Sequence, residues 1–168
     1  MPAILTPALA LRYLRQLSTD VRAAIVLDAD GRPLAGDGAI ARPAGALAAL
    51  LPAGAGELVV RVVDGGAPRG SALVVRAAAV APTLVLAVGS RALLDLLRHD
   101  ADAVAQALAG GAAASGELPP LPAGAVAVRD ASRCVQMSED DGFPVQTAIS
   151  AGMGLLDAVA AASVGSGD

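Results

Sequence analysis

The stretch Val21–Gly36, VRAAIVLDADGRPLAG, predicts two short strands joined by a tight turn. Ala24–Leu27 is an apolar run with β-branched residues, and Arg32–Ala35 leads the chain back. The turn between them, Asp28-Ala29-Asp30-Gly31, begins with a carboxylate that can accept hydrogen bonds from the backbone ahead of it. It ends with Gly31, which adopts positive φ without a Cβ penalty. The stretch therefore predicts a β-hairpin.

A helix is predicted immediately before the hairpin. Thr6-Pro7 combines a capping hydroxyl with proline at the first helical position, which is typical of a helix start. Apolar residues then recur at helical spacing, at Ala10, Leu11, Leu14, Leu17 and Val21. We expect this helix to end around 18–20.

A second, short helix is predicted after the hairpin, over Ala44–Leu51. Pro43 can open it, and Pro52 followed by two glycines ends it. Such a short alanine-rich helix needs packing to persist. Its apolar face carries Leu47, Leu50 and Leu51.

Three strands and a long helix complete the predicted domain. The strands are Glu57–Val63 (ELVVRVV), Ser71–Ala79 (SALVVRAAA) and Thr83–Val88 (TLVLAV). The last is the most continuously apolar, which indicates a central strand covered on both faces. The helix is predicted over Arg91–Leu108, with Ser90 as its N-cap and Gly110-Gly111 as its stop.

The composition divides the chain of 168 residues into a domain and an extension. We expect a domain over 1–109, a Gly/Ala/Pro linker over 110–122, and an acidic, weakly structured extension over 123–168. The extension contains a possible short strand at Ala123–Arg129, an acidic turn at Ser138–Gly142 and a weak apolar helix at Gln146–Ala162. It can be flexible, or dock on a partner or on the body of the protein itself.

The charges argue against nucleic-acid and membrane binding. Residues 1–109 carry ten Arg against nine acids, whereas 110–168 carry two Arg against seven acids. Phosphate recognition needs a basic face, which this distribution does not supply. The uncharged runs Ala77–Ser90 and Gly142–Leu156 are shorter than the roughly 18 residues that span a membrane and contain proline. We expect a cytoplasmic location.

The residue types of common active sites do not gather in the sequence. His99 is the single histidine and is interpreted as a solvated or capping residue, and Cys134 is the single cysteine. One His and one Cys cannot form a structural zinc site. Asp28, Asp30 and Asp37 lack the ligand pattern of a calcium loop, and a phosphate-binding P-loop needs a lysine, which the chain lacks. We therefore predict no catalytic residue, no metal and no cofactor, and we do not expect an enzyme.

The predicted element order, helix–strand–strand–helix–strand–strand–strand–helix over Pro7–Leu108, resembles the roadblock/dynein light chain family. The resemblance is carried by the leucine-spaced first helix and by the segments VRAAIVLDADGRPLA, ELVVRVV, ALVVRAAA, TLVLAV and SRALLDLLRH. It covers roughly two-thirds of the chain. It implies an α+β fold of roadblock/profilin-like shape, in which helices flank a five-stranded antiparallel sheet.

The resemblance also implies how the protein acts. In that family two subunits pair along the third strand and the second helix, here Glu57–Val63 and Ala44–Leu51. The implied interface residues are Leu47, Leu50, Leu51, Leu58, Val60, Arg61 and Val62. An apolar edge strand independently needs to be covered or paired. Bacterial relatives act with small Ras-like GTPases as activators or scaffolds, so the implied function is a homodimeric signalling adaptor.

A second class of function stays open. Sensor domains of PAS/GAF type have a similar general shape and bind small ligands in an enclosed pocket. The Val, Leu and Ala of the predicted strands fit a filled core better than such a pocket. For the dimer hypothesis, we expect Val60→Asp or Leu47→Asp to separate the two copies.

Overall fold

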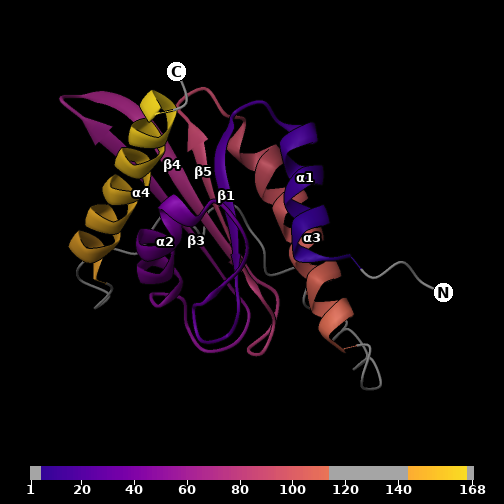
Figure 1. Ribbon diagram of the computed structural model, residues 1–168. Helices are drawn as coiled ribbons and strands as arrows, with labels where there is room; N and C mark the ends of the chain where they lie inside the picture. The colour runs from indigo at the N-terminus through magenta and orange to yellow at the C-terminus, as the bar shows by residue number, and fades with distance from the viewer. Residues whose placement is uncertain (1–4, 114–143, 166–168) are drawn as a thin grey trace.

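The computed structural model describes residues 5–113 and 144–165 (Figure 1). The elements, in chain order, are α1 (Pro7–Leu17), β1 (Val21–Leu27), β2 (Pro33–Gly36), the 3-10 helix η1 (Gly38–Ile40), α2 (Ala41–Ala48), β3 (Gly56–Asp64), β4 (Ala67–Arg76), β5 (Thr83–Gly89), α3 (Leu94–Ala113) and α4 (Val145–Gly165). The predicted order through α3 is confirmed, and with it the α+β class.

The hairpin forms as its turn residues predict. The Asp28 Oδ1 atom accepts hydrogen bonds from the backbone N–H groups of Asp30 at 2.9 Å and Arg32 at 2.8 Å. Gly31 has a φ of 78°, which is the conformation that this turn requires. β1 and β2 then pair antiparallel, with an irregular register between Val26 and Leu27.

The five strands form one antiparallel sheet in the order β2-β1-β5-β4-β3. β5 lies in the middle, between β1 and β4, and residues Thr83–Val88 are all buried. The prediction that TLVLAV is a central strand covered on both faces is therefore confirmed. β2 and β3 form the two edges.

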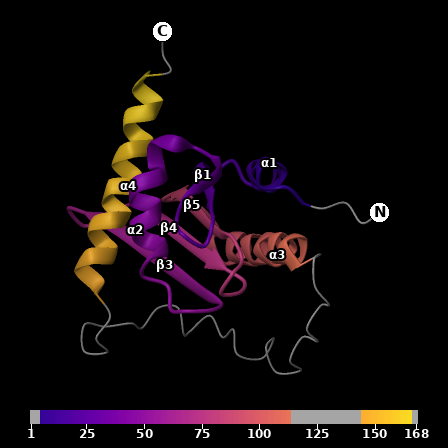
Figure 2. The same cartoon turned by 60° about the horizontal axis from the view of Figure 1, so that its bottom comes forward.

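Helices cover both faces of the sheet, as the two views show (Figure 2). Because side chains alternate along a strand, each strand contributes to two cores. One core contains Ile25, Val74 and Val85 with residues of α2 and α4. The other contains Val26, Leu73 and Leu86 with residues of α1 and α3. The result is three layers, in which α2 and α4 share one face and α1 and α3 share the other.

The predicted bounds of α2, β4 and α3 are wrong by a few residues, and β4 spans Ala67–Arg76 rather than 71–79. α2 spans Ala41–Ala48 rather than 44–51, so Pro43 lies inside its first turn, where a missing N–H costs no helical hydrogen bond. α3 begins at Leu94 because the segment before it forms a turn, in which the Ala92 N–H donates to the Gly89 carbonyl at 3.2 Å. α3 also continues through Gly110-Gly111 to Ala113. Glycine lowers helix propensity but stops a helix only where it adopts positive φ, which Gly110 does not.

The weak apolar helix predicted at 146–162 is present as α4, Val145–Gly165. It packs on the body of the protein, beside α2 and over β3 and β4 (Figures 1 and 2). The predicted short strand at 123–129, the acidic turn at 138–142 and most of the linker lie outside the described residues.

Candidate interaction surface

Four of the predicted interface side chains lie together on the side of the sheet that carries α2. Leu47 is 0% exposed, Leu51 8%, Val60 5% and Val62 1%. Leu47 comes from α2, Leu51 follows it, and the two valines come from β3. We call these four residues the α2–β3 face. The structure brings them together as the sequence predicts, but it buries them within a single chain.

The other three predicted interface residues differ in exposure. Leu50 and Leu58 are half-buried and pack against the same core. Arg61 is exposed, and its side chain points to the opposite side of the sheet because it alternates with Val60 and Val62. Arg61 therefore belongs to the rim of β3 and not to the α2–β3 face.

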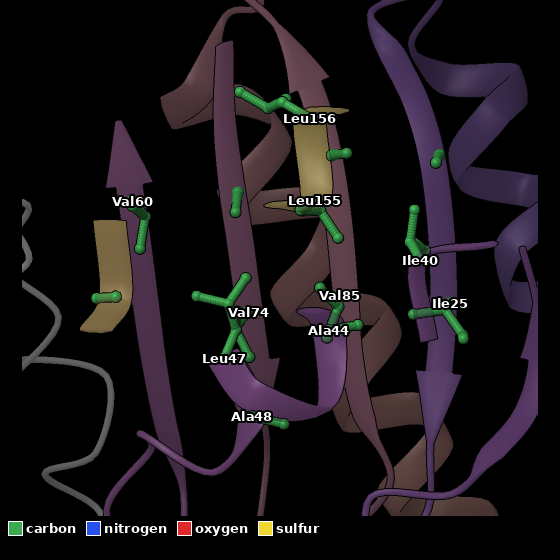
Figure 3. Close-up of a cluster of buried hydrophobic side chains, with 14 of the residues drawn as sticks. Ile25, Ile40, Ala44, Leu47, Ala48, Val60, Val74, Val85, Leu155 and Leu156 are labelled. Carbon is green, nitrogen blue, oxygen red and sulfur yellow. The ribbon is translucent and has the colours of Figure 1, made fainter. Parts of the chain in front are cut away.

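Helix α4 lies beside α2 and covers the two valines of the α2–β3 face. Its residues Ala148, Leu155 and Leu156 are buried in the same core, where Figure 3 shows the two leucines. The closest approach is at Gly152, where an added Cβ would lie 2.9 Å from the Val60 Cγ1 atom and 3.4 Å from the Val62 Cγ2 atom. Glycine at this position therefore lets the helix backbone approach the sheet.

Docking of the C-terminal helix on the body of the protein was one of the options that the sequence left open, but nothing indicated Gly152 as the point of contact. A glycine within a helical pattern lowers helix propensity, and it can also mark a close approach. Nothing in the pattern of small residues specifies which surface the helix approaches. The glycines were therefore consistent with a close helix contact, but the sequence did not identify the surface contacted.

Two polar contacts connect the sheet near this surface to its helices. The Arg69 guanidinium donates to Asp157 of α4 at 2.8 Å, and both side chains are substantially exposed. On the other side of the sheet, Arg98 of α3 pairs with Glu57 of β3, and their side chains are only 15% and 20% exposed. Arg98 thus anchors α3 to the edge strand.

We expect Arg98→Ala to lower the free energy of unfolding by about 1–3 kcal/mol, because it leaves a largely buried Glu57 carboxylate without its main partner. Chemical denaturation measures the change. Arg91→Ala is the control, since Arg91 is exposed and should stay within about 0.5 kcal/mol of the original protein. Equal stability of the two variants would contradict a structural role for the Arg98–Glu57 pair.

The backbone of β3 forms an edge of the sheet. Its pairing with β4 runs from Gly56 opposite Arg76 to Asp64 opposite Ala67. Among the described residues no strand lies on its other side. An edge of this length presents unpaired N–H and C=O groups, which can accept another strand.

The groups considered for catalysis or metal binding do not converge. His99 is exposed on α3, and Asp28 is occupied by the hairpin turn. Asp37 accepts a hydrogen bond from the Ala24 N–H at 2.9 Å and pairs with Arg15. Over residues 5–113 and 144–165 no group of three or more His, Cys, Asp or Glu could hold a metal ion. Cys134 lies outside the described residues.

Two pockets bear on the sensor alternative. One, of about 420 Å³, lies between the β3–β4 hairpin and the start of α3, and the exposed residues Arg61, Val63 and Leu93 line it. The other, of about 300 Å³, lies between η1 and the end of α4. Both open to the surface rather than into the sheet. Neither is the enclosed cavity that a PAS/GAF-type sensor needs.

Helix α4 has one further property. Over Val145–Val164 it is long and apolar enough to cross a membrane by length and composition, with a mean hydropathy of 1.5. Core helices of soluble proteins pass the same test. Leu155 and Leu156 of this helix lie in the core beside α2 (Figure 3).

A comparison with models of known protein families finds no match for this chain. A search of curated proteins likewise finds no relative.

Proposed function

We propose that this protein is a non-enzymatic adaptor of the roadblock type, which forms a homodimer and regulates or scaffolds a small Ras-like GTPase. The order of helices and strands through α3 supports the proposal, because it is the order that the resemblance implies. The observation that carries it is the position of β3. This strand lies at the sheet edge, next to the α2–β3 face, where the resemblance places the contact between subunits.

The dimer contact has two parts. The main chain of β3 offers unpaired hydrogen-bonding groups over Gly56–Asp64, so two copies can pair there as antiparallel strands and extend the sheet. The adjoining α2–β3 face adds apolar side chains only where α4 does not cover them, because these side chains are at most 8% exposed in the single chain. A patch that meets its own copy about a two-fold axis closes the assembly at two subunits.

The adaptor acts by differential binding. A protein that contacts one nucleotide state of a GTPase better than the other shifts the equilibrium between the two states, and it needs no catalytic residue of its own to do so.

The dimer contact is tested at Arg61. This side chain is exposed at the β3 rim and has no ion-pair partner among the described residues, so Arg61→Glu should leave the fold intact. It adds two acidic groups to a two-fold interface, and we expect the dimer dissociation constant to rise roughly tenfold or more. Sedimentation equilibrium measures the change. Arg12→Glu, an equal charge reversal on the exposed side of α1, is the control and should have no effect.

The partner is tested by capture. The immobilised full chain is exposed to Ras-like GTPases from the native cell extract, loaded with either GDP or a non-hydrolysable GTP analogue. We expect one nucleotide state to be retained preferentially. Retention of neither state, or of both equally, would contradict regulation of a GTPase while leaving the dimer untouched.

A further inference from the structure

Part of the surface that the dimer would use is covered by α4, which contacts Val60 and Val62 of the α2–β3 face at Gly152. Leu47, Leu51, Val60 and Val62 are at most 8% exposed while α4 is in place. A second copy cannot contact these side chains until the helix leaves. The two occupants of the α2–β3 face therefore exclude each other.

The attachment of α4 is weak for a helix of its length. Only 22% of the residues in the apolar stretch within Val145–Val164 are buried. Apart from Leu155 and Leu156, the residues that pack inward are alanines, Val159 and Gly152, which bury little area each. The ion pair between Arg69 and Asp157, with side chains 31% and 61% exposed, adds little in water.

α3 and α4 are far apart in the chain, because α3 ends at Ala113 and α4 begins at Val145. The body that α4 leaves keeps the core between the sheet and α1 and α3, whereas the core beneath α2 loses Ala148, Leu155 and Leu156. What release exposes is an apolar surface, and such a surface favours association.

A second copy of this chain is the occupant that fits the vacated surface best. The α2–β3 face is continuous with the unpaired edge of β3, so one approach satisfies the backbone groups and the apolar side chains together. Each copy presents the same side chains, which makes the patch self-complementary.

We propose that α4 is an intramolecular competitor for the dimer surface: when bound it keeps the chain monomeric, and when released it exposes the α2–β3 face to a second copy. This inference rests on the proposed function, because it assumes that two copies meet at this face. It adds a control that the resemblance does not imply, since the competing helix lies outside the region that the resemblance covers.

Two glycines of α4 provide a matched test in the full chain. Gly152→Ala places a Cβ 2.9 Å from the Val60 Cγ1 atom, whereas Gly154→Ala meets only the Pro43 Cβ at an ordinary 3.7 Å. Both changes raise the helix propensity of α4 equally. Gly152→Ala and the larger Gly152→Leu should therefore weaken the attachment, and Gly154→Ala should not.

Hydrogen exchange measures release of α4, and sedimentation equilibrium measures association. For Gly152→Leu we expect faster exchange of the α4 amides and a dimer dissociation constant lower by roughly tenfold, with a smaller change in the same direction for Gly152→Ala. Gly154→Ala should match the original protein in both measurements. If exchange in Gly152→Leu stays slow, the double variant with Asp157→Arg, which also removes the ion pair to Arg69, replaces it.

The outcomes separate the two proposals. Faster exchange together with unchanged dimerisation would overturn the competition and leave the dimer standing. A released α4 with no association at micromolar concentrations would overturn the dimer itself, and the competition with it. Association that rises equally in Gly152→Leu and Gly154→Ala would also overturn the competition, because only the first substitution collides with β3.

Discussion

Gly36→Val should unfold the protein or come close to it. Gly36 ends β2 with a φ of 114°, a conformation that side chains other than glycine rarely adopt. An added Cβ would also lie 2.3 Å from the Ala24 carbonyl oxygen, 2.7 Å from the Ile25 Cα and 2.9 Å from the Leu11 Cδ1. Two of these three atoms belong to the backbone of β1, which cannot move without disrupting its pairing with β5.

The expected cost combines backbone strain with overpacking and amounts to about 4 kcal/mol or more, a large part of the stability of an ordinary domain. Thermal unfolding followed by circular dichroism measures the change. The control is Gly38→Ala in η1, two residues away, where φ is not positive and no atom lies within 4 Å of the added Cβ. A Gly36→Val protein as stable as this control would contradict the close packing of β2 against β1.

Leu47→Asp and Val60→Asp should unfold the single chain and not merely separate two copies. Leu47 is 0% and Val60 5% exposed in the core shared by α2, α4 and the sheet. A carboxylate at either position loses its hydration without gaining a partner, which costs several kcal/mol. The cavity left by the lost apolar side chain adds to this cost.

Both variants should therefore show a lower urea midpoint at concentrations where the original protein is monomeric, with a loss of about 4 kcal/mol for Leu47→Asp. The comparison is Arg61→Glu, at the exposed residue next to Val60, and this variant should keep the urea midpoint of the original protein. Unchanged stability of Leu47→Asp would mean that this position does not lie in the core in solution. The sequence-based expectation that these variants separate a dimer stays a prediction. Arg61→Glu tests the dimer contact better, because it should not destabilise the single chain.

The sequence predicts the sheet well because local chemistry specifies it. The Asp28-to-Gly31 segment has the residues of a tight turn, and the apolar run Leu84–Val88 favours a strand covered on both faces. The capping of α1 by Thr6, whose Oγ1 accepts from the Leu9 N–H at 3.3 Å, is equally local. Each of these features depends on residues a few positions apart.

The part that sequence reasoning could not supply depends on distant pairs. The resemblance assigns Leu47 and Val60 to a dimer interface, but their apolar pattern is the same whether a second molecule or the chain's own core buries them. Hydrophobic periodicity predicts that a side chain is buried, but it does not identify the helix, strand or second molecule that buries it. The Arg98–Glu57 pair was missed for a similar reason, since an arginine on a helix and a glutamate at the start of a strand are ordinary surface residues until the fold brings them together.

The central position of β5 has a consequence for how the chain reaches its native state. The pairs β1–β2 and β3–β4 are hairpins of neighbouring segments, but they are joined only by β5, where Val26 meets Leu84 and Val74 meets Val85. The β4–β5 pair is local, because β4 ends at Arg76 and β5 begins at Thr83, whereas β1 ends at Leu27. We therefore expect the β1–β5 pairing to form late, because a large loop must close before these strands meet. A chain that ends before Thr83 contains two hairpins that no strand joins. The same arrangement makes the domain indivisible, since no cut between the hairpins leaves a fragment with its own complete core.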